Sequence, residues 1–355
     1  MGVPQGLAGG WEVGLLLVML AIGAILVVSL FLLNRIHHRR TERATRLEGM
    51  LESLVPQWTR QSPSPEEVRW LSRLPRPDRT VLFRICCRTL PDLEGDAVAQ
   101  VRNVLQRSGL LDQEVARLRH RDWGQRADAC HVLGRLGHAS AIPALVARLH
   151  DSNATVRQQA VGALGDLRAV EALDAMVDAL DRFQGWGNLL AIMALSRMGP
   201  AAAPRLGALL GASNSPARTK ALLQVTAQLG IAADPGLIRA LARHPEAEVR
   251  IEAVRTLGHI APEPESIAIC LDAMEDPEWP TRALAARSLG RLGGHQAVVR
   301  LEQAMGDSSY WVRHHSGEAL TKLGDTGKAA LARSLNHANR FVRDMAAQVD
   351  RKSVV

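Results

Sequence analysis

The sequence predicts an all-α protein in which a single N-terminal transmembrane helix precedes an α-solenoid of about eight helical hairpins. Three observations support this fold class: residues 13–33 form one uncharged apolar run, a helix of similar sequence recurs after residue 121, and the composition favours Ala, Leu and Arg. Only 3% of the 355 residues are aromatic, and runs of β-branched residues are scarce. This composition disfavours sandwiches and barrels, because their strands are rich in such residues.

The apolar run from Val13 to Leu33 reads VGLLLVMLAIGAILVVSLFLL. As a helix it would be roughly 31 Å long, which matches the apolar core of a bilayer. A cleaved signal peptide is the alternative, but Met1 to Trp11 contains no Lys or Arg, and no small-residue cleavage site follows the run. We therefore expect the helix to remain in the protein and to lie in the lipid bilayer.

The charges on either side of the run predict its orientation. Glu12 is the only charged residue before it, whereas five arginines follow it closely: Arg35, Arg39, Arg40, Arg43 and Arg46. Under the positive-inside rule, residues 1–12 are a short extracytoplasmic tail and the bulk of the chain lies in the cytosol. The expected location is the inner (cytoplasmic) membrane of a bacterium, crossed once.

Two further regions separate the span from the repeats. Residues 34–55 are expected to form a basic juxtamembrane helix, and residues 56–120 a Pro-rich linker followed by capping helices. Ser64 and Glu67 have the spacing of a capping box, and Pro65 occupies the first helical position. The repeat array is assigned to residues 121–355.

The repeat is recognised because a helix of similar sequence recurs several times along the chain. VRQQAVGALGDL begins at Val156, VRIEAVRTLGHI at Val249 and TRALAARSLGRL at Thr281. A marker position recurs at intervals of 30 to 32 residues, at Arg126, Arg157, Asn188, Arg218, Arg250, Arg282, Arg313 and Arg343. A second apolar helix follows the marked one, as in AIPALVARL from Ala141. Each unit is thus a helical hairpin that buries its apolar faces by stacking on its neighbours.

Residues Asp151 to Leu167 match, almost residue for residue, the pattern Asp-x-x-x-x-Val-Arg-x-x-Ala-x-x-Ala-Leu-Gly-x-Leu. They resemble the short HEAT-like repeats of phycocyanobilin lyases, and the resemblance covers about two thirds of the chain. It implies a bacterial HEAT-repeat solenoid but no particular activity, since one fold hosts many functions. It also implies a structural ladder of Asp-Arg pairs between adjacent turns, made here by Asp151 with Arg157, Asp276 with Arg282 and Asp307 with Arg313.

The sequence offers no catalytic constellation. No His is followed by Glu, the ligand dipeptide of HEAT-like di-iron hydroxylases, and side chains of the adjacent His314 and His315 diverge by about 100° on a helix. The cysteines form no C-x-x-C pair and are expected to be reduced, mostly buried thiols: Cys86, Cys87, Cys130 and Cys270. We therefore expect no metal, no cofactor and no enzymatic activity.

Exposed surface is what remains for function. In HEAT-like stacks the marked helix generally lines the concave side, and its exposed positions fall five and nine residues after the marker. The strip predicted in this way is mainly basic, and its candidate partner-binding residues are Arg135, Arg197, Arg255, His259, Arg287, Arg291 and Lys322. Such a strip suits an acidic protein segment through Arg-carboxylate pairs, although an ordinary solvated helix face is the alternative.

A second candidate surface is an aromatic edge, two or three residues before the marker. It consists of Trp123, Trp186, Trp279, Trp311 and Phe341. Exposed aromatic residues serve as anchors in interfaces, but an amphipathic Trp also covers the turn between neighbouring helices. Both interpretations stay open at this point, as does the choice between the basic strip and the aromatic edge.

The expected function is that of a membrane-anchored cytosolic scaffold or adaptor, which binds a membrane-associated partner protein through its repeat surface and regulates or assembles a complex. The alternatives are a bilin-lyase-like enzyme or subunit and a membrane-tethered nucleic-acid-binding protein. Nucleic acid is the poorer partner, because residues 121–355 carry 27 basic and 24 acidic residues, an excess of only three charges. The sequence names neither the partner nor the oligomeric state.

Overall fold

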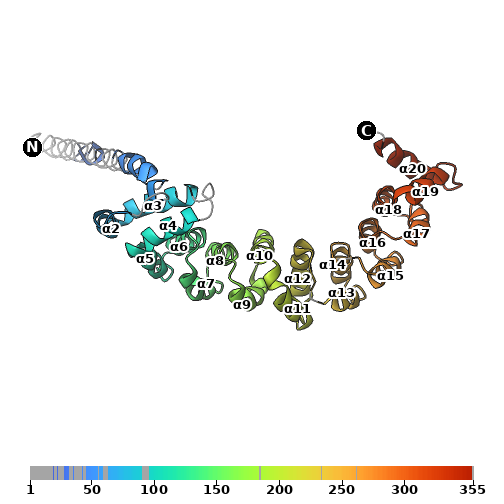
Figure 1. Cartoon of the computed structure of the whole chain (residues 1–355), viewed down its shortest axis with the longest axis horizontal. Helices are drawn as coiled ribbons and strands as arrows, with labels where there is room; N and C mark the ends of the chain where they lie inside the picture. The colour runs from blue at the N-terminus through green and yellow to red at the C-terminus, as the bar shows by residue number, and fades with distance from the viewer. Residues whose placement is uncertain are drawn as a thin grey trace, which may run out of the picture. The chain divides into compact units, whose positions relative to one another are not determined.

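The structure is a computed structural model of the chain, and its described residues form helices and turns without strands (Figure 1). The residues it describes are 19, 22, 28–31, 35, 42, 45–54, 56–58, 63–89, 96–183, 185–232, 234–260 and 262–353. The chain divides into two compact units, Met1–Gln113 and Glu114–Val355. The predicted all-α repeat solenoid is confirmed for the second unit.

The expected membrane span, Val13 to Leu33, lies mostly outside the described residues, and so does the expected tail at residues 1–12. Within the part of the chain that the structure describes, no helix combines the length and the apolar character needed to cross a bilayer. The span therefore stays a prediction from the sequence.

The first unit contains helical residues 45–54 and three bounded helices, α2 (Pro65–Ser72), α3 (Arg76–Thr89) and α4 (Asp96–Arg107). The predicted capping box at the start of α2 is confirmed. Ser64 Oγ accepts a hydrogen bond from the Glu67 amide at 3.2 Å, and Glu67 Oε2 accepts one from the Ser64 amide at 2.6 Å. α5 (Leu110–Arg117) spans the division between the two units in the sequence.

The second unit stacks helical hairpins in two rows, so that the first helices of the repeats contact one another in turn (Figure 1). The first-helix row comprises α6 (Trp123–Arg135), α8 (Ala154–Asp166), α10 (Trp186–Ser196), α12 (Pro216–Leu229), α14 (Ala247–Leu257), α16 (Trp279–Leu292), α18 (Tyr310–Lys322) and α20 (Arg340–Ser353). The second-helix row comprises α7 (Ile142–Arg148), α9 (Leu173–Asp178), α11 (Ala203–Gly211), α13 (Pro235–Leu241), α15 (Pro264–Ala273), α17 (Ala297–Ala304) and α19 (Gly324–Ser334).

One continuous apolar core runs through this unit, from Leu118 to Val349. It begins earlier than the expected array boundary at residue 121, because Leu118 is buried in it and Val115 packs against it. Cys130 and Cys270 are buried free thiols in the same core. Burial raises the pKa of Cys130 to about 12, so this thiol stays protonated and unreactive at neutral pH.

Glycines in the first helices set how closely neighbouring repeats approach. Gly134, Gly165 and Gly290 each follow their marker by eight residues. A Cβ built on Gly134 would lie 2.5 Å from the Cα of Ala163, and one on Gly165 would lie 2.7 Å from the Cα of Ala194. Side chains do not fit at such distances, so these helices touch backbone to backbone.

The structure corrects the register of α12. With Arg218 as its marker, Leu223 and Ala227 should be exposed, but both are buried, whereas Gln224 and Gln228 have solvent access. The marker is therefore Thr219, which changes the neighbouring intervals from 30 and 32 residues to 31 and 31. Arg218 instead pairs with Asp178 and Asp181 at 3.2 and 2.7 Å.

The Asp-Arg ladder exists, but the carboxylates take different partners from those expected. Asp151 accepts two hydrogen bonds from Arg126, the marker of the preceding repeat, at 2.8 and 2.7 Å. Arg157 reaches Asp151 only through the backbone, where its Nη1 donates to the Asp151 carbonyl at 2.8 Å. The side chain of Arg157 thus stabilises the loop before its own helix. The Asp151 carboxylate, bonded to Arg126, links two neighbouring repeats.

The same arrangement recurs at the other two expected pairs. Arg250 binds the carboxylate of Asp276 at 2.7 and 3.1 Å, and Arg282 binds that of Asp307 at 2.9 and 3.0 Å. Arg282 also donates to the Asp276 carbonyl at 2.8 Å, and Arg313 donates to the Asp307 carbonyl at 2.7 Å. Arg313 has no ladder carboxylate beyond it among the described residues, and its guanidinium lies 4.6 Å from the ring centroid of Phe341.

The ladder makes stability depend on acid pH. Burial alone would raise the pKa of Asp151, Asp276 and Asp307, but hydrogen bonds from the arginines and from backbone amides prevail and hold each pKa below its ordinary value. The unfolded chain then takes up protons first, so the stabilisation is complete above about pH 4 and is lost as the pH falls further. We expect the melting temperature to drop over that range, and to drop less in Asp307→Asn. An equal drop in both proteins would contradict this.

Candidate functional site

The predicted basic strip lies on the first-helix row, but its members differ in how they are compensated. Arg197, directly after the end of α10, is ion-paired with Asp166 on α8. Arg135 on α6 is half-buried. Further along the row, Arg255 and His259 at the C-terminal end of α14 lie beside Arg287 and Arg291 of α16. We call these four residues the cationic cluster.

Contacts within the cluster leave its positive charge largely uncompensated. An Nη1 of Arg291 contacts Nε2 of His259, so these side chains meet across the two helices. Arg255 has one acidic neighbour, Glu252, with Nη1 and Oε2 3.3 Å apart, and its side chain is 42% exposed. Arg287 is exposed and makes no hydrogen bond or ion pair among the residues that the structure describes.

The pKa values of His259 and Arg291 are lowered by burial and also by the positive charges around them. Burial lowers the pKa of His259, and the charges of Arg291, Arg287 and Arg255 lower it further. Burial, then Arg287 and Arg255, also lower the pKa of Arg291. A bound anion would relieve this repulsion, and two arginines without a strong partner can grip a carboxylate or a phosphate in bidentate fashion.

The cluster ends at α18, where an acidic residue enters the surface. Glu318 lies 3.3 Å from ring nitrogens of both His314 and His315. Its burial raises its pKa, but the His315 hydrogen bond and the charges of His314, His315 and Lys322 outweigh that effect and lower it. Lys322, the last predicted strip residue, therefore has a compensating carboxylate nearby.

The aromatic edge is half exposed along the array. The exposed fractions are 51% for Trp123, 45% for Trp279, 52% for Trp311 and 46% for Phe341. The side chain of Trp186 lies outside what the structure describes. About half of each of these four side chains is therefore accessible to a partner.

Sequence reasoning missed Tyr310, which extends the edge at the start of α18. Its ring lies edge-on to Trp311 at 5.6 Å and stacks on His314 at 5.7 Å. Trp311 in turn lies 6.3 Å from His315, whose pKa is lowered mainly by burial and further by the charges of His314 and Arg287. The adjacent Tyr-Trp pair was the only available signal, and Tyr310 is the single tyrosine of the chain.

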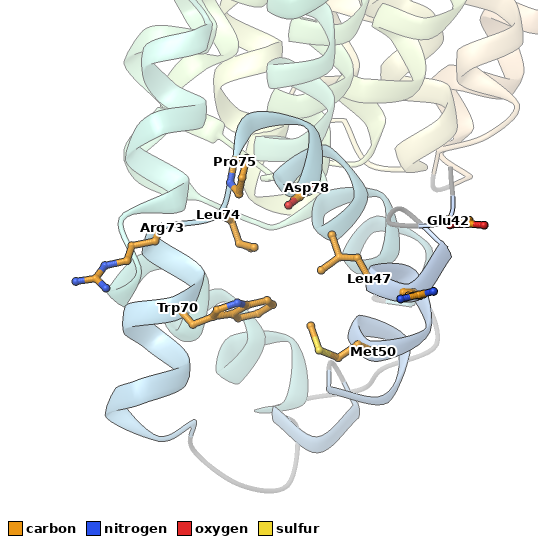
Figure 2. Close-up of a pocket in the computed structure, with 9 residues that line it drawn as sticks. Glu42, Leu47, Met50, Trp70, Arg73, Leu74, Pro75 and Asp78 are labelled. Atoms are coloured by element: carbon orange, nitrogen blue, oxygen red, sulfur yellow. The ribbon is translucent and has the colours of Figure 1, made fainter. Parts of the chain in front are cut away.

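A separate cavity of about 420 Å³ lies within the first unit, between residues 42–50 and residues 70–78. Figure 2 shows Leu47, Met50, Trp70 and Leu74 facing its interior, whereas the side chain of Arg73 points away. The lining carries two acidic and two basic residues, so it has no net charge. The cavity has room for a small apolar group and offers no charge-based preference.

No group of three or more His, Cys, Asp or Glu side chains placed to hold a metal ion is found in the described part of the chain. His314, His315 and Glu318 are in contact with one another, but Glu318 bridges the two imidazoles. The feature with the clearest chemical character is thus the cationic cluster.

Comparison with known proteins identifies the repeats. Residues 112–186 and 235–321 match the family model of HEAT repeats, which supports HEAT repeats in these two segments of the array. A relative, phycocyanobilin lyase subunit alpha of Synechococcus elongatus, is 24% identical over 232 residues, which cover 62% of this chain and 78% of the relative.

Two solved structures align with this chain. The Kap95:Nup1 complex aligns with a TM-score of 0.54 at 12% identity, over 85% of this chain and 49% of the other. The complex of CpcE and CpcF of phycocyanin lyase from Nostoc aligns with a TM-score of 0.33 at 20% identity, over 69% and 94%. At 12% identity, the likeness to the Kap95:Nup1 complex concerns the fold alone.

Proposed function

We propose that the chain is a membrane-anchored scaffold or adaptor, and that its HEAT-repeat unit binds an acidic segment of a partner protein at the cationic cluster. The observation that carries this proposal is the group of Arg255, Arg287 and Arg291 around His259, where Glu252 is the single carboxylate in contact among the residues that the structure describes. The partner's carboxylates would supply the missing counter-charge.

Two further points support a protein partner. The array is long and offers repeated exposed positions instead of one enclosed site, and half-exposed aromatic rings lie along its edge. The fold is also one that assembles with other proteins, as Kap95 does with Nup1 in their complex. Anchoring by residues 13–33 would confine the surface to the membrane plane and raise its effective concentration near membrane proteins.

A bilin-lyase-like role is the second candidate, and the relative among phycocyanobilin lyases favours it. The cationic cluster would then hold the acidic side chains of a tetrapyrrole. This role predicts that the purified protein carries or binds a visible chromophore, with an absorption band that is lost when the cluster is reversed.

The test is crosslinking in native membranes, followed by purification of the full chain and identification of co-purified proteins. We expect one dominant protein, absent when Arg255, Arg287 and Arg291 are all changed to Glu. The matched control reverses Arg119, Arg121 and Lys328, which are exposed and lie outside the cluster, and which change the net charge equally. The control should recover the partner as the wild type does.

Recovery of the same partner by both reversed variants would disprove the role of the cluster. Deletion of residues 13–33 is expected to release the chain from the membrane fraction and to reduce recovery of the partner. If the deleted chain still sediments with membranes, the anchoring part of the proposal is wrong, while the binding part is judged by the charge reversals alone.

A further inference from the structure

One residue from each first helix from α6 to α18 forms a regular line along the array, five positions after the marker. With the corrected register of α12, this contact row consists of His131, Gly162, Met193, Gln224, Arg255, Arg287 and Glu318, at intervals of 31 or 32 residues. Every member is exposed or half-buried. A partner chain crossing the first-helix row would meet these positions one after another.

The step between consecutive positions follows from how the helices pack. Packed helices lie about 8–10 Å apart, and the glycine contacts show that the backbones of neighbouring first helices touch. A Cβ on Gly290 would lie 2.8 Å from the Cα of Ala319, and one on Gly258 would lie 2.9 Å from that of Ser288. Direct contact between Arg291 and His259 shows that equivalent positions on α16 and α14 are within side-chain reach.

A polyproline II segment is the extended conformation whose side chains recur at a spacing of about 8–10 Å. In a polyproline II segment, side chains three residues apart point the same way and are separated by about 9 Å. In a β-strand, residues two apart point the same way but are separated by only about 6.7 Å. A helix would present residues seven apart at about 10.5 Å, beyond the range expected for close-packed first helices.

We propose that the contact row binds an extended, polyproline II-like segment of the partner that carries two acidic residues three positions apart, one for Arg255 and one for Arg287. This inference rests on the proposed function and specifies its partner. Glu318 at the next position repels a third acidic residue, and Gln224 on the other side takes a polar one. Met193, which is 46% exposed, takes an apolar residue beyond that.

Neighbouring groups make the two arginines suitable for this task. Arg255 stands over Glu252, a residue only 4% exposed whose Oε1 accepts a hydrogen bond from Gln224 at 2.8 Å. This buried pair orients Arg255 without covering it. Arg291 lies beside the row, in contact with His259, and adds positive potential along the same line.

The test uses the purified full chain and fluorescent synthetic peptides of one composition, rich in Pro and Ala, with two Asp residues placed two, three or five positions apart. Fluorescence anisotropy at fixed salt should give a dissociation constant about tenfold lower for the three-residue spacing, since only that peptide makes both charged hydrogen bonds. Arg287→Gln should remove the preference, and Arg121→Gln, outside the row, should retain it.

The outcomes separate this inference from the proposed function. If all spacings bind equally well and all depend on Arg287, the contact-row inference is wrong and the acidic partner stands. If no acidic peptide binds above the level of the triple Glu variant, both are wrong. Tighter binding of a single-stranded oligonucleotide with the same dependence on Arg287 would overturn the proposal in favour of a phosphate backbone.

Discussion

Replacing Gly165 with Ala is expected to lower the free energy of unfolding by about 1–3 kcal/mol, although Ala is ordinarily the better helix former. The added Cβ would lie 2.7 Å from the Cα and Cβ of Ala194 and 2.9 Å from its carbonyl oxygen. These atoms belong to a neighbouring helix of the same row, so they cannot rotate away. The two repeats must move apart, and buried contacts on both sides are lost.

Gly162 in the same helix is the matched control. A Cβ there would meet nothing within 4 Å, and its backbone is ordinary helix. Gly162→Ala should therefore raise stability by up to about 1 kcal/mol, the usual gain of helix propensity. Chemical denaturation of both variants followed by circular dichroism decides the matter. A stabilising Gly165→Ala would show that the repeats do not touch backbone to backbone.

Arg282→Ala is the second change with a large expected effect, a loss of about 1–3 kcal/mol. The guanidinium makes two bonds to the Asp307 carboxylate and two to the carbonyls of Asp276 and Pro277. Both side chains of the ion pair are only 16% exposed. Removing the arginine leaves a poorly hydrated carboxylate and two unpaired carbonyls at the junction of two repeats.

Arg243→Ala serves as the control for an ion pair of similar length. Arg243 and Asp272 are 2.8 Å apart, but their side chains are 65% and 66% exposed, so water replaces the lost partner. Thermal unfolding should show a lower midpoint for Arg282→Ala and an almost unchanged one for Arg243→Ala. Equal shifts in the two variants would mean that the ladder contributes no more than a surface pair.

The repeat could be predicted from the sequence because each hairpin has the same buried positions at nearly the same interval. Which arginine binds which carboxylate in the ladder could not be predicted from the sequence. Asp151 lies six residues before Arg157 and 25 residues after Arg126, so either arginine could be its partner. Both spacings recur equally well, and only the packing of neighbouring repeats decides which carboxylate an arginine reaches.

The correct register of α12 could have been inferred from the spacing of the repeats, although the residue types point elsewhere. Arg218 fits the marker by residue type, yet the buried positions follow Thr219. The uneven intervals of 30 and 32 residues on its two sides were the sign of that shift. Residue type misleads here because Arg218 is used for a different ion pair, with Asp178 and Asp181.

The candidate site could be predicted only in part. The sequence named all four members of the cationic cluster, because exposed positions of an amphipathic helix follow from its period. It gave equal weight to Arg197, which Asp166 neutralises from the neighbouring helix. Such compensation depends on contacts between residues 31 positions apart, and a helical period within one repeat carries no information about them.

The most direct test of the central claim is a charge exchange between the chain and the partner recovered from membranes. Reversal of the partner's acidic residues to Lys should abolish its binding to the wild-type chain, and the variant with Arg255, Arg287 and Arg291 changed to Glu should restore it. That result would place the partner's acidic segment on the cationic cluster. If the reversed partner still binds the wild type, or if the reversed chain fails to restore binding while remaining folded, the cluster is not the binding surface.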